Sequence, residues 1–211
     1  AKVGQQALDE ARLQPRLANS QFWQALSTDP MPGATSVARH HADLAYLQLT
    51  AFKNLAPDSE FVVCVPCHYE RADLSLLLGL MDAASIAVRA LIDPGVLLAS
   101  KALSATTNLL YLDVGLHAVT LTVIKQGAQL QRSSSLIAHS AGYLNIIDRL
   151  ANYAAAALVK KSRFDPLQHA STEQQLFQQL LQPDYPIAIL GQGLISLHHE
   201  GVQYDVQLPD T

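Results

Sequence analysis

Hydrophobic and polar positions change their period along the chain, and these changes predict its secondary structure. Helices with one apolar face are expected over residues 7–13, 22–26 and 37–52. An apolar run over 61–65 predicts a buried strand, followed by a helix over 70–84, a strand over 86–92 and a helix over 95–103. Strand, helix and strand at this spacing form a βαβ unit, which implies that the two strands pair in parallel.

After residue 104 the pattern changes to alternating apolar positions. Successive strands are predicted over 109–114, 118–125 and 128–137, and short turns such as Gln126-Gly127 indicate an antiparallel meander. The remaining elements are expected to be helices over 142–161 and 172–182 and short strands over 187–190, 194–198 and 202–208. The change near residue 104 predicts two domains, residues 1–103 and 104–211, with residues 61–65 and 109–114 in central strands of different sheets.

The composition is that of a chain that can bury a core. Its 211 residues are 49% hydrophobic and 15% charged, which suits one large or two small domains. A net charge of −4 offers no basic surface for nucleic acid. No apolar stretch approaches the roughly 18–20 residues of a membrane span, and no signal peptide is visible at Ala1. We therefore expect a cytoplasmic part of a longer protein, one that binds neither nucleic acid nor membrane.

The most informative motif is Asp113-Val-Gly115, which two apolar runs flank. A strand that delivers an aspartate into a tight glycine turn can hold a metal-bound phosphate with its carboxylate and with backbone N–H groups. Leu116 and His117 follow the glycine, however, where small residues would let a phosphate approach. The alternative for Asp113 is a strand-end aspartate that caps a turn, and for His117 a plain turn position is favoured. Asp93 precedes a proline, and a turn-starting aspartate is favoured there too.

Two cysteines, Cys64 and Cys67, have the Cys-x-x-Cys spacing of thioredoxin-type redox sites. The favoured alternative is that both are small buried side chains at a strand end. With His68 the motif also matches the attachment pattern of c-type haem. Zinc would need a fourth ligand from far away, such as His40-His41 or His198-His199.

Five segments spread over nearly all of the chain share their order and spacing with one family. They are Gly4-x-x-Ala7-x-x-x-Ala11-x-x-x-Pro15, Val62-Val-Cys-Val-Pro66-Cys-His-Tyr69, Leu91-Ile-Asp93-Pro94, Leu112-Asp113-Val-Gly115, and Gly142 with Arg149-Leu-Ala-Asn152-Tyr. In these segments the chain resembles the actin and heat-shock-chaperone ATPase superfamily, closest to its chaperone branch. The resemblance implies an α/β fold of two ribonuclease-H-like (actin-like ATPase) lobes that face a nucleotide cleft, incomplete at both ends of this chain.

The resemblance also implies roles for individual residues. Asp113 would be a catalytic carboxylate near the magnesium ion of a bound ATP, and Asp93 the carboxylate that orients water. Gly115 and Gly142 would pass close to phosphate, which makes them candidate cofactor-binding residues together with His117 in the same loop.

The chain departs from the family pattern at several of these positions. Family loops usually run Asp-x-Gly-Gly-Gly-Thr, whereas Leu116, His117 and Ala118 follow Gly115 here. Leu8 stands where a lysine is expected, and residues 174–179, rich in glutamine, stand where charged side chains hold adenosine. Losing one donor of a phosphoryl-transfer site typically lowers the rate by about 10²–10³. We therefore expect that this chain alone does not bind ATP and Mg²⁺.

Three hypotheses follow for the function. The leading one is a superfamily member whose nucleotide handling is weakened or lost and which acts through contacts with a protein partner or client. The second is a working ATPase whose missing loops lie outside this chain. The third is a thiol redox protein that uses Cys64 and Cys67.

Overall fold

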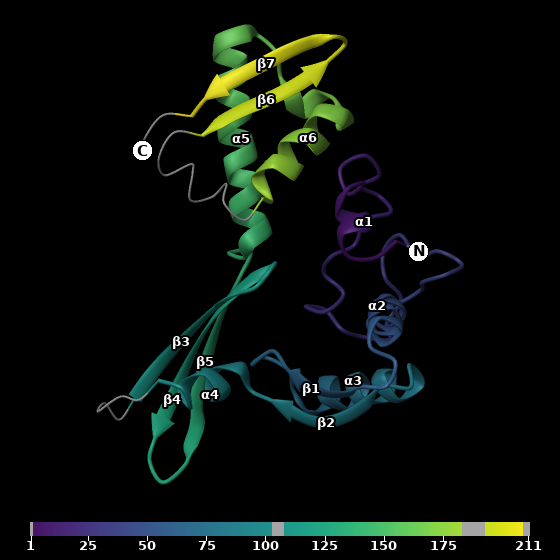
Figure 1. Cartoon of the computed structure of the whole chain (residues 1–211), viewed down its shortest axis with the longest axis vertical. Coiled ribbons are helices and arrows are strands. Elements are labelled where there is room, and N and C mark those ends of the chain that lie inside the picture. The colour runs from purple at the N-terminus through teal and green to yellow at the C-terminus, as the bar shows by residue number, and fades with distance from the viewer. Residues whose placement is uncertain (1, 103–107, 183–192, 209–211) are drawn as a thin grey trace. The chain divides into compact units, whose positions relative to one another are not determined.

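The computed structural model describes residues 2–102, 108–182 and 193–208, which form small β-sheets and helices of a mixed α/β chain (Figure 1). The chain divides into two compact units. One consists of Ser20–Tyr143 with Ala1, and the other joins Lys2–Asn19 to Leu144–Thr211. The predicted boundary between domains 1–103 and 104–211 lies outside the described residues. In the described part, no helix combines the length and apolar character needed to cross a membrane.

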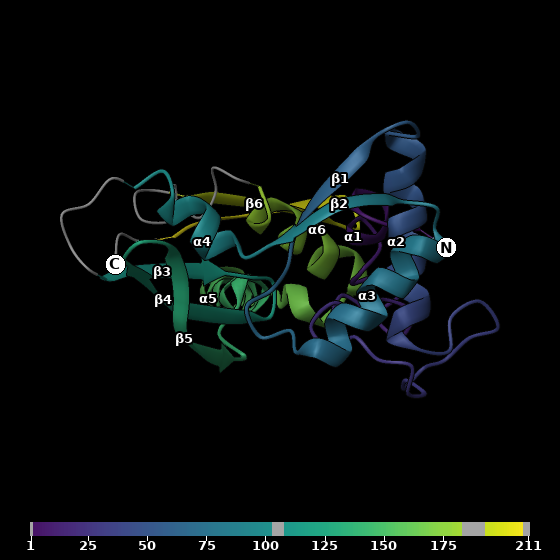
Figure 2. The same ribbon diagram turned by 90° about the horizontal axis from the view of Figure 1, so that it is seen from below.

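The first unit contains the predicted βαβ arrangement. Strands β1 (Glu60–Cys64) and β2 (Ala87–Ile92) pair in parallel, and α3 (Arg71–Ala83) connects them. Helix α2 (His41–Leu55) lies beside α3, next to this pair of strands (Figure 2). A short helix, α4 (Pro94–Ala99), follows β2. The parallel pairing is confirmed.

The β1 strand is not buried as expected. Its positions alternate between exposed and half-buried, and the Val62 side chain is 53% exposed. The alternation arises because one face of β1 packs on a hydrophobic core while the other does not. That core includes Ala45 and Leu49 of α2 and Leu77 and Met81 of α3.

The helix predicted over residues 22–26 is wrong, because these residues form turns. Phe22 and Trp23 nevertheless pack against the same core. The Trp23 indole N–H donates to the Gln48 side chain at 2.6 Å, and the Tyr69 hydroxyl donates to the Trp23 carbonyl oxygen at 2.6 Å. Tertiary contacts therefore hold this segment, together with a turn in which the Ala25 N–H donates to the Gln21 carbonyl oxygen at 2.9 Å.

The predicted meander is confirmed as an antiparallel sheet of order β3-β4-β5. Its strands are β3 (Asn108–Val114), β4 (Ala118–Gln126) and β5 (Leu130–His139). As expected, β1 and β3 belong to different sheets. The expectation that both are central strands is wrong for the described sheets, because β1 belongs to a two-stranded sheet and β3 lies at the edge of a sheet in which β4 is central.

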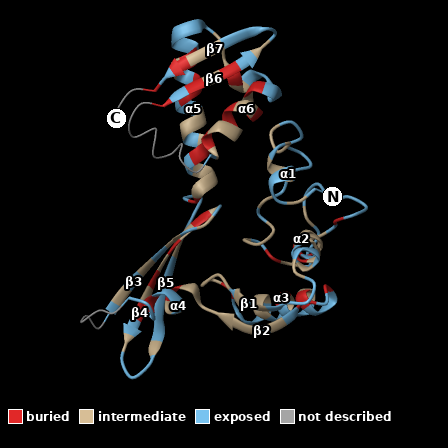
Figure 3. Ribbon diagram, viewed as in Figure 1, coloured by how far each residue is buried: buried red, intermediate tan, exposed pale blue. Residues whose placement is uncertain are grey.

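The two faces of this sheet differ. One face carries the buried positions Ala118, Thr120, Thr122 and Ile124 of β4. The opposite face of the sheet is apolar and exposed over β3 and β5. Figure 3 marks exposed positions along both strands. The most exposed side chains there are Leu110 at 70%, Leu112 at 61% and Leu136 at 69%.

The second unit is built around two helices and a hairpin. Its elements are α1 (Gln5–Leu8), α5 (Tyr143–Ser162), a 3-10 helix η1 (Pro166–Gln168), α6 (Ala170–Leu180), β6 (Leu194–His199) and β7 (Val202–Gln207). The hairpin turns at Glu200-Gly201, both with positive φ, as tight two-residue turns require. Leu158, Leu176, Ile195 and Leu197 are fully buried in its core. The strand predicted over 187–190 lies outside the described residues.

Glutamine side chains of α6 occupy the free edge of β6. The Gln179 amide donates to the Ser196 carbonyl oxygen at 2.7 Å and accepts from its N–H at 3.3 Å. Gln175, one turn earlier, makes the same pair of bonds with His198 at 3.0 and 2.8 Å. An amide side chain carries both a donor and an acceptor, so two glutamines at this spacing replace part of a neighbouring strand.

We predict that Gln179→Glu destabilises the protein by about 1 kcal/mol, because an ionised carboxylate cannot donate to the Ser196 carbonyl oxygen. The matched control is Gln182→Glu, in which the exposed side chain lies just beyond α6 and the change should stay under about 0.5 kcal/mol. Urea denaturation measures both. Equal midpoints for the two variants would show that the glutamine does not support the edge of β6.

Candidate functional site

Asp93 ends β2 and begins α4. Its Oδ1 atom accepts hydrogen bonds from the backbone N–H groups of Gly95 at 2.9 Å and Val96 at 3.2 Å. Pro94 occupies the first turn of the helix, where a missing N–H costs nothing. Asp93 is therefore an N-cap, whereas the sequence favoured a turn-starting aspartate.

Arg132 of β5 takes the other oxygen of this carboxylate. Its Nη1 atom lies 3.1 Å from Asp93 Oδ2 and donates to the Cys67 carbonyl oxygen at 2.9 Å. The Asp93 side chain is 19% exposed and that of Arg132 is 41% exposed. A single guanidinium thus joins the ends of β1 and β2 to the meander. Sequence reasoning missed Arg132, since it reaches this position through a bulge that places it opposite Ile124.

Both candidate carboxylates act electrostatically on the hydroxyl group of Tyr111. Tyr111 alternates with Asp113 on the half-buried face of β3, and its ring packs so close to Gly95 that an added Cβ would lie 2.8 Å from Tyr111 Cδ1. Burial raises the pKa of the Tyr111 hydroxyl, and the negative charges of Asp113 and Asp93 raise it further. The structure therefore brings Asp93 and Asp113 within electrostatic range of one tyrosine hydroxyl.

The Gly115 turn packs onto the start of α5. The Gly115 N–H donates to the Ala118 carbonyl oxygen at 2.9 Å, and the Gly115 carbonyl oxygen accepts from the Tyr143 N–H at 2.8 Å. A Cβ on Gly142 would lie 2.5 Å from backbone atoms of His117 and Ala118. Because Gly142 has no side chain, its backbone can lie directly against the backbone of residues 117 and 118.

His117 belongs to this turn and faces the N-terminal part of the first unit. Its Nε2 atom lies 3.0 Å from the Ser20 hydroxyl oxygen. The ring is half-buried, and this hydrogen bond fixes its position in the turn. Two of the candidate cofactor-binding residues thus make contacts within the protein: His117 with Ser20, and Gly142 with the backbone of residues 117 and 118.

Metal binding would depend on Asp113. In the described part of the chain, no group of three or more histidine, cysteine, aspartate or glutamate side chains is arranged to hold a metal ion. Asp93 is a poor ligand in this geometry, because two N–H groups and a guanidinium occupy its oxygens. The charge of Arg132 also opposes a second cation at the same carboxylate.

Cys64 and Cys67 are both free thiols. The expectation that both are buried is wrong, because Cys64 is exposed and Cys67 is half-buried. Strand pairing continues past Cys64, where the Val65 N–H donates to the Ile92 carbonyl oxygen at 3.0 Å, and Pro66 keeps Val65 extended. Residues 67 and 68 then form a turn, in which the Tyr69 N–H donates to the Pro66 carbonyl oxygen at 3.1 Å.

His68 follows the cysteine motif with its ring turned inward. Both ring nitrogens are buried, and neither has a hydrogen-bond partner among the described residues. The ring meets Tyr69 edge-on, with centroids 5.2 Å apart. Burial lowers the pKa of His68, the charge of His139 lowers it further, and that of Asp73 opposes the shift. His68 thus packs as a neutral ring.

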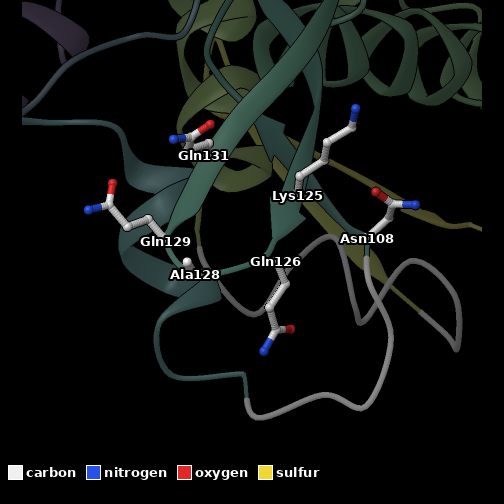
Figure 4. Close-up of a pocket in the computed structure, with 7 residues that line it drawn as sticks. Asn108, Lys125, Gln126, Ala128, Gln129 and Gln131 are labelled. Atoms are coloured by element: carbon white, nitrogen blue, oxygen red, sulfur yellow. The ribbon is translucent and has the colours of Figure 1, made fainter.

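A cavity of about 600 Å³ opens at the far end of the meander from Asp113. Its lining consists of Asn108, Lys125, Gln126, Gly127, Ala128, Gln129 and Gln131. Figure 4 shows that the polar side chains point in different directions and do not converge on one point. A small-molecule site usually needs a few polar groups aimed at the ligand. The cavity is therefore a weak candidate.

The glutamine-rich stretch of α6 is bonded to protein backbone. Gln174 donates to the Leu8 carbonyl oxygen at 2.9 Å and accepts from the Arg12 N–H at 2.8 Å. Gln175 and Gln179 bind β6 as described above. The side chains that stand where the resemblance places adenosine-holding residues thus make structural contacts.

Neither a scan against protein-family models nor a search of curated proteins returns a match. The resemblance to the actin and heat-shock-chaperone ATPase superfamily therefore depends on the motifs that carry it.

We predict that Gly142→Ala destabilises the protein by about 1–3 kcal/mol, because the new Cβ would overlap the backbone of residues 117 and 118. Gly79→Ala is the matched control. Gly79 lies in α3 with open space around it, so alanine there should stabilise by about 0.5–1 kcal/mol. Urea denaturation gives both values, and a neutral Gly142→Ala variant would contradict the packing described here.

We further predict that His68 makes the protein sensitive to acid. Its pKa in the folded state lies below the ordinary 6.5, so the unfolded chain binds the proton more tightly. The stabilisation is fully present above pH 6.5 and is lost as the pH falls through the folded pKa. The free energy of unfolding of His68→Phe should therefore change less between about pH 7.5 and about pH 5 than that of the wild type. His198→Phe, at an exposed position, should keep the wild-type loss.

Proposed function

We propose that this chain is a divergent member of the actin and heat-shock-chaperone ATPase superfamily, with two ribonuclease-H-like lobes, whose nucleotide handling is lost. It acts through contacts with a protein partner or client, as a scaffold or chaperone-like factor. The observation that carries the proposal is the engagement of Asp93. Each of its carboxylate oxygens is bonded within the protein, to the start of α4 and to Arg132.

A carboxylate that orients attacking water needs an oxygen free to accept from that water. Asp93 would have to break its bond to Arg132 or uncap α4 to supply one. Breaking either contact leaves a largely covered charge or unpaired N–H groups, which is costly. These costs favour a structural role for Asp93.

The apolar face of the meander supports action through protein contacts. Leu110, Leu112 and Leu136 are each more than 60% exposed on this face. Exposed apolar patches of several hundred Å² are uncommon on monomers and often mark sites of interaction. A scaffold or chaperone-like factor needs a surface of this kind.

The second candidate is a working ATPase in the full-length protein. The charges of Asp93 and Asp113 both raise the pKa of the Tyr111 hydroxyl, so both candidate carboxylates lie within electrostatic range of one side chain. The third candidate, a thiol redox protein, rests on the spacing of Cys64 and Cys67 alone. Two unbridged thiols also fit the reducing cytoplasm, which we propose as the location.

We predict that isothermal titration of this chain with Mg-ATP gives no saturable binding, and that Asp113→Asn leaves this result unchanged. The same titration on the full-length gene product separates the two candidates. Binding by the full-length product alone would favour the ATPase. Saturable binding to the 211-residue chain that Asp113→Asn abolishes would overturn the proposal.

A further inference from the structure

Arg12 is the most fully engaged cation of the second unit. Its guanidinium forms ion pairs with Asp148 of α5 and, at 3.3 Å, with Glu173 of α6. The Cζ atom lies 4.4 Å from the centroid of the Phe177 ring, as in a cation–π contact. Two helices thus contribute two carboxylates and one aromatic face to a single arginine, whose side chain is 28% exposed.

The main chain around Arg12 is held as well. Gln174 of α6 accepts from the Arg12 N–H and donates to the Leu8 carbonyl oxygen. Gln178 donates to Asp9 Oδ1 at 3.3 Å. The two Gln174 contacts are made to backbone atoms and do not depend on side-chain identity, so α6 recognises the course of the peptide as well as its arginine.

These contacts have the composition of a peptide-recognition site. A planar guanidinium matches two carboxylates and one ring face, which an ammonium group cannot do equally well. The paired donor and acceptor of Gln174 fix the register of the bound segment relative to the arginine. One face of the two helices thus selects the charge of the arginine, stacks an aromatic ring on its guanidinium and fixes the register of the peptide.

We propose that the α5–α6 face, made by Asp148, Glu173, Gln174 and Phe177, is a binding site for an arginine-bearing peptide segment, occupied here in cis by residues 8–12. The proposal is independent of nucleotide handling, because none of these side chains belongs to the Asp93 or Asp113 cluster. It adds a second contact surface, with a ligand of defined chemistry, to the apolar face of the meander.

Because residues 8–12 of the same chain occupy the site, a separate peptide can bind only by displacing them. A tethered segment acts at an effective concentration in the millimolar range for short linkers, so a free peptide competes poorly with it. Weakening the cis segment at Arg12 should expose the site. Arg16 provides the matched control, since it lies in the same segment, is exposed and forms no ion pair with a described residue.

The experiment uses a fluorescent synthetic peptide of residues 4–16 and the full 211-residue chain. Fluorescence anisotropy should show that the Arg12→Ala variant of the chain binds the peptide at least about 10-fold more tightly than the wild-type chain or the Arg16→Ala variant does. A peptide carrying Arg12→Ala should lose this binding, and one carrying Arg16→Ala should keep it. The chain with both Arg12→Ala and Glu173→Gln should bind at least about 10-fold more weakly than chain with Arg12→Ala alone.

Circular dichroism checks that each chain variant is folded. If Arg12→Ala does not fold, Arg12→Lys replaces it, because lysine keeps the charge but lacks the planar fork. Equal affinity of the peptide for the Arg12 and Arg16 variants of the chain would overturn the proposal. Equal binding by the two substituted peptides would overturn it too, since the site would then not read the arginine.

Discussion

The ion pair between Asp93 and Arg132 is the contact on which the first unit depends. One carboxylate caps α4 and accepts the guanidinium, which also holds the turn after β1 through the Cys67 carbonyl oxygen. Among the described residues the βαβ unit and the meander are separate sheets, and no backbone ladder joins them. In the absence of such a ladder, side chains must fix their relation, and a partly covered charge pair with additional N–H donors does so with defined geometry. The need for this contact restricts what else Asp93 can do.

The second unit uses the same principle with neutral groups. Its two-stranded sheet has few backbone bonds of its own, and an isolated hairpin is marginally stable in water. Gln175 and Gln179 supply amide groups to the edge of β6, while Gln174 binds the N-terminal segment. Because the glutamines lie on one helix, α6 is bonded to the hairpin and to residues 8–12 at once. These contacts explain a glutamine-rich helix without a bound nucleotide.

Periodicity predicted most of the elements because it depends on local sequence. The βαβ unit and the meander followed from apolar spacing and turn residues, and both have the pairing expected. The error at residues 22–26 has a physical cause: three apolar residues at helical spacing can equally fill a core from an irregular segment, as Phe22 and Trp23 do. Spacing alone does not distinguish these cases, since tertiary contacts decide between them.

The site was less predictable than the fold. Asp93 and Asp113 were found from their positions at strand ends, but their partners were not. Arg132 lies 39 residues from Asp93 and reaches it only because a bulge shifts the register of β5. Tyr111 looked like an ordinary strand residue, and only the packing of β3 against Gly95 places its hydroxyl near both carboxylates. Such pairings depend on three-dimensional register, which a single sequence does not specify.

Gly142 shows why a motif can match without its chemistry. A glycine close to phosphate and a glycine against another backbone segment meet the same requirement, the absence of a Cβ. Here the neighbour of Gly142 is the backbone of residues 117 and 118, so the motif is satisfied by packing alone. Glycines in this turn therefore carry little information about nucleotide binding. The carboxylates carry more, because their oxygens are either free for a ligand or bonded within the protein, and those of Asp93 are bonded.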